Sequence, residues 1–344
     1  MVNTIKYEDL DNSTKNSNFI LIDVRSPSEY QTQTIPDAIN VPIFTDKERS
    51  IIGTMYKQES MEKAKITGVR FVSRKLPDIY EKIFKFNKIY NKLIFFCDRG
   101  GFRSTSLVSL FYSLGIGAFK LDNGYKGYRK YINNRLPETV KDIKFIVLYG
   151  NTGVGKTHIL ESVEDQGLNI LDLEGCANHR GSMLGSVGLG EPNTQKMFES
   201  LIYESLKKRN SNIVFVEGES RKIGKVTIPT CIYESMRNGI NINIKASMEK
   251  RINNILKDYV HDTDDELIKS LNYLRYHLSN DTVDRFIELI NQDKYKIVIE
   301  ELMTKYYDLL YERKNIKFET VFYNEHTKNT AKDIIKWTKN NYCK

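Results

Sequence analysis

The residues from Gly150 to Thr157 form the pattern Gly-x-x-x-x-Gly-Lys-Thr directly after the apolar run from Phe145 to Tyr149. Glycines at this spacing let successive backbone amides turn toward an anion, the start of the following helix adds a partial positive charge, and Lys156 adds a full one. The pattern therefore predicts a phosphate-binding loop in a strand, loop and helix setting. The residues expected to bind a diphosphate are Gly150, Gly153, Gly155, Lys156 and Thr157, and Thr157 is also the expected Mg²⁺ ligand if a metal is used.

A cysteine loop lies earlier in the chain. Cys97 follows the apolar run from Leu93 to Phe96 and precedes two glycines, an arginine and a segment of helical character. Inward-facing amides and a helix start stabilise a thiolate, so we expect Cys97 to be a nucleophile. The expected anion contacts are Arg99, Gly100, Gly101 and Arg103, with Arg103 bracing a tetrahedral anion. The alternatives are a buried structural cysteine before a turn and, for Arg99, an exposed salt bridge.

Two further loops carry charged side chains after predicted strands. The segment from Asp172 to Ser182 follows one strand, and the run that begins at Glu217 follows another. Ligands of open α/β sheets bind at the carboxyl edge, so both loops should converge on Lys156. The candidates on them are Glu174, His179, Arg180, Glu217, Glu219, Ser220 and Arg221. The alternative is that these acids are only solvated and that the His-Arg pair lies on the surface.

Strands alternate with helices along most of the chain, which indicates α/β architecture with parallel sheets. A polar segment with a proline, from Pro137 to Lys144, is the predicted linker. We therefore expect a first domain over 1–136 and a phosphate-loop α/β domain over 137–344. Within the second domain, apolar residues recur three and four apart over about 247–313, which predicts an inserted helical segment.

The 344-residue chain has a formal charge of +8 and a pI near 9.0, which favours a polyanionic partner, although a bias toward lysine codons gives the same balance. Its four cysteines, at 97, 176, 231 and 343, form no Cys-x-x-Cys pair, so neither a zinc site nor a disulfide framework is expected. We find no signal segment and no apolar run long enough to span a bilayer, so a cytoplasmic location is expected.

The first domain resembles the rhodanese family. The resemblance rests on the Cys97 loop and on Asp23-Val24-Arg25, Glu29-Tyr30, Ala38 to Pro42 and Gly124-Tyr125. Five residues separate Cys97 from Arg103, where common sulfurtransferases have four. A wider loop suits a larger tetrahedral anion such as a chalcogen-phosphate. Asp23 and Arg25 are expected to be structural and to hold the cysteine loop.

Over nearly its full length the chain resembles the bacterial tRNA 2-selenouridine synthases. The motifs are the phosphate loop, Leu173 to Ser182, Glu219 to Gly224, Gly53 to Lys57 and Tyr306-Tyr307-Asp308. The resemblance implies replacement of sulfur by selenium in the wobble 2-thiouridine of a tRNA anticodon loop. It also implies selenophosphate as donor and an S-geranyl intermediate made from geranyl diphosphate. Cys97 would then handle selenium, the phosphate loop would hold the prenyl diphosphate, and tyrosines and lysines over 250–315 could face the tRNA.

Two other functions fit some of these residues. One is an ATP-dependent sulfurtransferase or kinase fusion acting on RNA, which predicts ATP turnover that depends on Lys156. The other is a non-catalytic RNA-binding module with a relic cysteine loop, which predicts that Cys97→Ser leaves tRNA modification unchanged.

Overall fold

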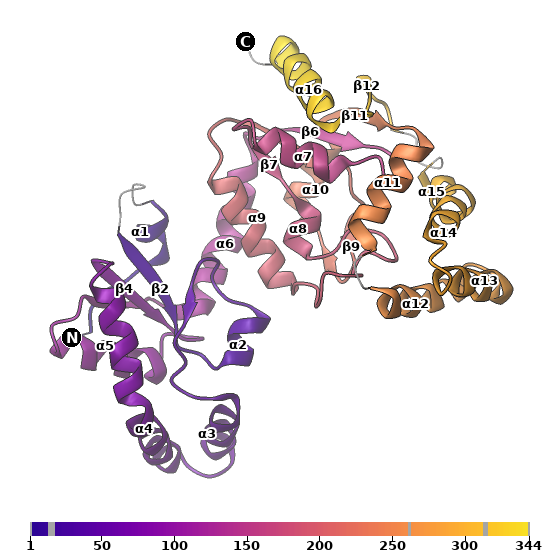
Figure 1. Ribbon diagram of the computed structural model, residues 1–344. Coiled ribbons are helices and arrows are strands. Elements are labelled where there is room, and N and C mark those ends of the chain that lie inside the picture. Colours follow the sequence, from indigo (N-terminus) through magenta and orange to yellow (C-terminus); the bar gives the residue numbers. More distant parts are fainter. Residues whose placement is uncertain (1, 13–17, 261–262, 312–315, 343–344) are drawn as a thin grey trace. The chain divides into compact units, whose positions relative to one another are not determined.

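The computed structural model describes residues 2–12, 18–260, 263–311 and 316–342. These residues divide into two compact units, Met1–Arg135 and Leu136–Lys344 (Figure 1). Each unit has its own parallel five-stranded sheet and its own apolar core. The predicted fold class is confirmed: a rhodanese-like α/β unit precedes a phosphate-loop α/β unit that carries a helical segment.

The sheet of the first unit has the strand order β1-β5-β4-β2-β3, and all its pairs are parallel. Its central strands β2 and β4 are apolar except for Asp23 at the end of β2 and Lys92 at the start of β4, as expected of a parallel sheet with both faces covered. The strands are β1 (Thr4–Ile5), β2 (Phe19–Asp23), β3 (Ile39–Asn40), β4 (Lys92–Phe96) and β5 (Ala118–Leu121).

Capping residues define where the helices of the first unit begin. Ser26 and Glu29 form a capping box at the start of α2, and Thr45 and Glu48 form another at α3, so unpaired amides of the first turn are satisfied. The helices are α1 (Tyr7–Asp11), α2 (Pro27–Thr32), α3 (Asp46–Gln58), α4 (Met61–Asn87), α5 (Phe102–Ser113) and α6 (Gly124–Val140).

The predicted linker is wrong in its first half. Helix α6 continues through Pro137 and ends at Val140, which is buried, as is Ile143 just before the next strand. Burying the apolar side chains of Val140 and Ile143 stabilises the folded protein, so this segment is packed against the core although most of its residues are polar.

The sheet of the second unit has the order β12-β11-β6-β8-β7, again with parallel pairs. Its strands are β6 (Lys144–Tyr149), β7 (Ile170–Leu171), β8 (Ile213–Glu217), β11 (Ile240–Lys245) and β12 (Thr320–Tyr323). A short antiparallel pair, β9 (Lys222–Ile223) and β10 (Val226–Thr227), lies outside this sheet. The expected strand from Asn169 to Leu173 is shorter than predicted. Its end differs because Asp172 caps a helix, its side chain accepting the N–H of Gly175 at 2.7 Å.

Helices of the second unit fall into two groups. Those of the α/β part are α7 (Lys156–Glu164), α8 (Leu173–Ala177), α9 (Gln195–Lys207), α10 (Thr230–Arg237) and α16 (Thr327–Tyr342). Those of the helical segment are α11 (Met248–Tyr259), α12 (Asp264–Tyr273), a 3₁₀ turn (Leu274–Tyr276), α13 (Asn280–Ile290), α14 (Tyr295–Leu302), a π-helical turn (Met303–Tyr307) and α15 (Asp308–Tyr311).

The helical segment has a core of its own. Its buried residues come from α12, the 3₁₀ turn, α13, α14 and the π-helical turn, and Val187 from the loop after α8 packs among them. This contact brings the loop after α8 against the inserted helices. No helix in the described ranges combines the length and apolar character needed to cross a membrane.

Candidate functional site

The phosphate loop joins β6 to α7, as predicted. Gly153 and Gly155 have φ angles of +81° and +86°, in the left-handed region that favours glycine. A Cβ at Gly155 would lie 2.8 Å from the side-chain nitrogen of Asn324, so space as well as backbone angle requires glycine there.

Three side chains hold the backbone carbonyls of this loop. Arg251 Nε donates to the carbonyl of Thr152 at 2.9 Å, Asn254 Nδ2 to that of Gly153 at 2.8 Å, and Asn324 Nδ2 to that of Val154 at 2.7 Å. Carbonyl oxygens would repel an anion, so engaging them with donors favours a loop that presents amides to the ligand. Sequence reasoning missed all three residues.

Arg251 is itself fixed by an ion pair. Its two terminal nitrogens donate to the carboxylate oxygens of Asp308 at 2.9 and 2.6 Å, and the residue is buried. This gives a role to the Tyr306-Tyr307-Asp308 motif, whose acid connects the helical segment to the phosphate loop. In the sequence, Arg251 could have been found only as the unidentified partner of Asp308 in this motif.

Thr157 and Glu217 meet at the carboxyl edge of the sheet. The Thr157 hydroxyl donates to Glu217 Oε1 at 2.5 Å. Glu217 is fully buried, and burial together with the charges of Asp172 and Glu219 raises the pKa of its carboxyl to about 8. Its Oε2 has no hydrogen-bond partner among the described residues. An orphaned buried oxygen of this kind fits a cation as a missing partner.

Two more carboxylates lie near Gly181. A Cβ at Gly181 would lie 2.8 Å from Glu219 Oε2 and 3.0 Å from Glu174 Oε1. Burial and then the charges of Glu217 and Glu219 raise the pKa of Glu174 well above its ordinary value. The positive charge of Lys156 acts against these effects and favours a lower pKa for Glu174. The Lys156 ammonium also donates to the carbonyl of Gly150 at 3.1 Å.

His179 and Arg180 are held by the protein. The imidazole of His179 lies between Gly185 and Gly224, where a Cβ on either glycine would come within 2.7 Å of the ring. Burial lowers the pKa of His179, which makes it neutral at pH 7. Arg180 donates to the carbonyl of Val187 at 2.7 Å, and its guanidinium lies 4.8 Å from the Tyr259 ring.

A cavity of about 730 Å³ gathers most of the predicted residues of this unit. Ser220 and Glu219 line it from the loop after β8. Of the other candidates, Gly150, Glu217 and Arg221 lie outside the lining, and Arg221 donates to Thr230 Oγ1 at 3.3 Å. The predicted residues that line it are Gly153, Gly155, Lys156, Thr157, Glu174, His179, Arg180, Glu219 and Ser220.

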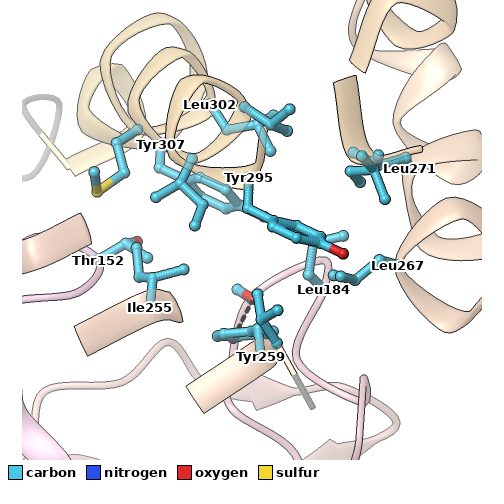
Figure 2. A pocket seen from close by; sticks show the side chains of 15 residues that line it. Thr152, Leu184, Ile255, Tyr259, Leu267, Leu271, Tyr295, Leu302 and Tyr307 are labelled. Carbon is cyan, nitrogen blue, oxygen red and sulfur yellow. Dashed lines mark hydrogen bonds between the residues drawn. The ribbon is translucent and has the colours of Figure 1, made fainter. Parts of the chain in front are cut away.

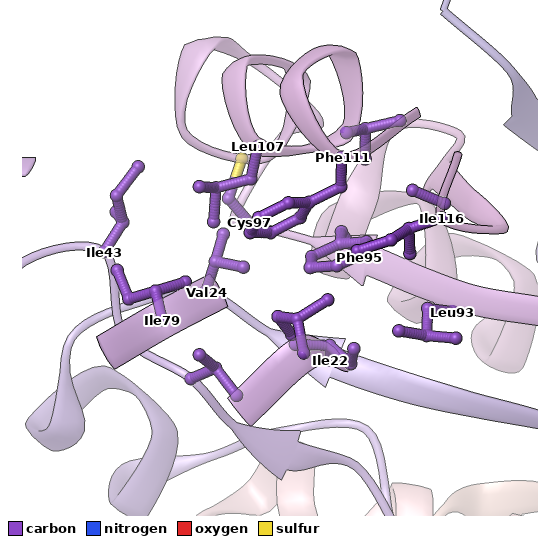
Figure 3. Close-up of a cluster of buried hydrophobic side chains, with 14 of the residues drawn as sticks. Ile22, Val24, Ile43, Ile79, Leu93, Phe95, Cys97, Leu107, Phe111 and Ile116 are labelled. Atoms are coloured by element: carbon purple, nitrogen blue, oxygen red, sulfur yellow. The ribbon is translucent and has the colours of Figure 1, made fainter. Parts of the chain in front are cut away.

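Cys97 follows β4, as predicted, but only 3% of its surface is exposed. It packs in the core of the first unit with Val24, Leu107 and Phe111 (Figure 3). Its Sγ lies 3.3 Å from Ser104 Oγ in the first turn of α5. The carbonyl of Gly101 lies 3.9 Å from Sγ, and a Cβ at Gly101 would meet no described atom within 4 Å, so the space next to Gly101 is open.

The arginines of the cysteine loop differ in what they contact. Arg103 Nη1 donates to Glu29 Oε2 at 2.6 Å, and its side chain is only 16% exposed. Arg99 has a side chain that is 76% exposed, 3.6 Å from Asp98. Phe102 is also exposed at 65%. This loop thus presents Arg99 and Phe102 to solvent, together with the half-exposed carboxylate of Asp98.

Asp23 and Arg25 form a buried ion pair, with Nη2 2.6 Å from Oδ2. Arg25 also donates to the carbonyl of Gln33 at 2.7 Å, and its guanidinium lies 4.4 Å from the Tyr125 ring. The pair therefore fixes the segment around Gln33, while the backbone amide of Tyr125 holds the carbonyl of Cys97 at 2.9 Å.

Comparison with known proteins agrees with this arrangement. The family described as tRNA 2-selenouridine synthase AAA domain matches residues 143–343, and the rhodanese-like domain matches residues 6–131. The chain belongs to the tRNA 2-selenouridine synthase family. It is 29% identical to the tRNA 2-selenouridine synthase of Pseudomonas fluorescens, over 85% of this chain and 87% of the relative.

Two more relatives of the family carry the same name. The one from Pseudomonas syringae pv. syringae is 30% identical over 85% of this chain and 87% of its own length. The one from Nitrosomonas eutropha is 32% identical over 70% of this chain and 63% of its own. The family expected from the sequence motifs is confirmed.

Proposed function

We propose that this chain is a tRNA-modifying transferase that converts wobble 2-thiouridine to 2-selenouridine. Geranyl diphosphate would first alkylate the sulfur, and selenophosphate would then supply the selenium that replaces it. Membership of the family supports the overall conversion, since its named relatives are tRNA 2-selenouridine synthases. The two-step route explains why one chain carries a phosphate-loop cavity and a cysteine loop.

In the first step the phosphate-loop cavity holds the diphosphate. The thiocarbonyl sulfur attacks C1 of the geranyl group, the C1–O bond breaks, diphosphate leaves with the electron pair, and the uridine loses its N3 proton to solvent. Lys156 and the loop amides stabilise the charge that develops on the departing diphosphate. Supporting this role, Arg251, Asn254 and Asn324 engage the loop carbonyls, and about 730 Å³ is available beside Lys156.

Thr157 and Glu217 would hold Mg²⁺ if the reaction uses one. The fit rests on the partnerless Glu217 Oε2 and on the hydroxyl of Thr157 beside it. Bound there, Mg²⁺ would neutralise charge on the diphosphate. Its positive charge would also favour the ionised form of Glu217.

In the second step Cys97 releases selenium as selenide. Its thiolate attacks the phosphorus of selenophosphate, an S–P bond forms, and the P–Se bond breaks with selenide taking the electron pair. Water then hydrolyses the S–P bond to give phosphate and free Cys97. Selenide adds to C2 of the S-geranylated uridine, and the C–S bond breaks with geranylthiol leaving. The open face at Gly101 is the side from which the anion would reach Sγ.

The tRNA would meet exposed cationic and aromatic groups. Arg99 and Phe102 are exposed beside the cysteine, and the chain carries a formal charge of +8. Aromatic side chains stack on unpaired bases of RNA loops, and cations release counterions from phosphates. These groups suit an anticodon loop as partner.

The observation that carries the proposal is the phosphate-loop cavity with its engaged carbonyls in a chain that also holds the Cys97 loop. To test it, the full chain is incubated with 2-thiouridine-containing tRNA, geranyl diphosphate and selenophosphate, and the nucleosides are separated by mass. The proposal expects S-geranyl-2-thiouridine without selenophosphate and 2-selenouridine with it. ATP turnover that depends on Lys156, with no effect of geranyl diphosphate, would favour the ATP-dependent fusion instead.

A further inference from the structure

A small apolar pocket adjoins the phosphate-loop cavity. It encloses about 50 Å³ between α11, α12, α14 and the π-helical turn (Figure 2). Five of its lining residues, Thr152, Ser182, Ile255, Tyr259 and Tyr307, also line the larger cavity. Because these five residues line both spaces, the apolar pocket lies directly beside the cavity of the phosphate loop.

The walls of this pocket offer little to a polar ligand. The hydroxyl of Tyr259 lies 3.3 Å from Ser182 Oγ, and that of Tyr295 donates to Asp264 at 2.9 Å. The side chains of Leu271, Leu302 and Ile299 supply much of the remaining wall. A nucleoside would leave its hydrogen-bonding groups without partners here, which costs free energy, whereas a hydrocarbon chain would not.

We infer that this pocket takes the terminal isoprene unit of a prenyl diphosphate whose diphosphate lies on Lys156. The inference deepens the proposed function and rests on it. A volume of about 50 Å³ corresponds to roughly four water-sized groups, close to one branched five-carbon unit. The preceding unit would lie along Ile255 and Tyr259, on the wall that both cavities share.

The far wall sets a limit on chain length. Leu267 and Leu271 lie opposite Thr152 and Ile255 (Figure 2), and both belong to the packed core of the helical segment. A third isoprene unit would have to displace that core, which overpacking makes unfavourable. The pocket thus selects a two-unit chain over a longer one.

The first test uses the unmodified full chain with Mg²⁺. Calorimetry measures the affinity for inorganic pyrophosphate and for dimethylallyl, geranyl and farnesyl diphosphates. The inference predicts that geranyl diphosphate binds about tenfold or more tightly than the dimethylallyl ester, and that farnesyl diphosphate binds no more tightly than geranyl diphosphate. Equal affinity for pyrophosphate and geranyl diphosphate would overturn it.

The second test changes the pocket. Ile299→Phe fills it, whereas Ile297→Phe adds the same ring at a position on α14 that is 43% exposed. Ile299→Phe should lower the affinity for geranyl diphosphate about tenfold with pyrophosphate affinity kept, which also shows that the variant is folded; Ile297→Phe should change neither. Ile299→Ala, which enlarges the pocket, should raise the relative affinity for the farnesyl ester.

Different results would contradict the prenyl pocket and the proposed function. If geranyl transfer to tRNA occurs but neither variant of Ile299 changes the ratio of geranyl to pyrophosphate affinity, the pocket is not the prenyl site. If the unmodified chain binds no diphosphate and modifies no tRNA, the proposed function fails and the inference with it.

Discussion

The carboxyl of Glu217 is buried, and the folded protein disfavours its charged form. Its folded pKa of about 8 lies above the ordinary value of 4.5, so the folded state loses stability as the pH rises from about 4.5 to about 8. Glu217→Gln removes this loss and can still accept from Thr157. With metal chelated, the variant should be about 1–3 kcal/mol more stable than the unmodified chain at pH 8 and nearly equal to it at pH 5. Urea denaturation at both pH values measures this; equal destabilisation at both would contradict it.

The pair between Glu29 and Arg103 has the opposite dependence on pH. Burial raises the pKa of Glu29, but the hydrogen bonds and charge of Arg103 outweigh burial and lower it. Its contribution to stability is therefore present above the ordinary carboxyl pKa and lost as the pH falls. We expect Arg103→Ala to cost about 1–2 kcal/mol at pH 7. A double-mutant cycle with Glu29→Gln should show a coupling free energy between the two side chains at pH 7 that becomes smaller at low pH. If the two substitutions change the free energy of unfolding additively at pH 7, the pairing is contradicted.

The sequence could predict which residues form the candidate site better than what each of their side chains contacts. Cys97, Lys156 and Thr157 follow from local motifs, because a loop between a strand and a helix largely fixes its own backbone. Arg103 was expected to brace an anion, yet it pairs with Glu29, and that long-range contact has no signature within the cysteine loop. Gly100, with φ of +64°, likewise has a structural role that the motif did not reveal.

At the scale of elements, α11 and α15 hold the phosphate loop. Arg251→Met would free the carbonyl of Thr152 and leave Asp308 without its partner. We expect pyrophosphate affinity to fall about tenfold, equivalent to about 1.4 kcal/mol. Calorimetry measures this. Arg285→Met is the matched control, since it breaks an exposed pair with Glu301 and should leave the affinity unchanged. Equal affinities for both variants would contradict the role of Arg251.

Most elements of the two sheets could be predicted from apolar runs and breaks. The helical segment was also expected from its three-and-four spacing. The apolar pocket could not be predicted, because it forms where α11, α12, α14 and the π-helical turn meet, and periodicity gives the inward face of each helix but not its neighbours. Likewise, the packing of Val187 against the inserted helices depends on tertiary structure alone.

At the scale of the whole molecule, we assign one step of the proposed reaction to each unit. The unit of residues 136–344 would transfer the geranyl group, and the unit of residues 1–135 would deliver selenium. Each step should therefore respond to a variant in its own unit. Because the geranylated uridine is the substrate of the second step, loss of the first step must also abolish the second.

The most direct test of this division is mass analysis of wobble nucleosides after reaction of the full chain and its Cys97→Ser and Lys156→Ala variants. The reaction contains thiolated tRNA, geranyl diphosphate and selenophosphate. We expect Cys97→Ser to accumulate S-geranyl-2-thiouridine with 2-selenouridine reduced at least a hundredfold, and Lys156→Ala to form neither product. Loss of both products in a folded Cys97→Ser variant, or unchanged 2-selenouridine in it, would contradict the account.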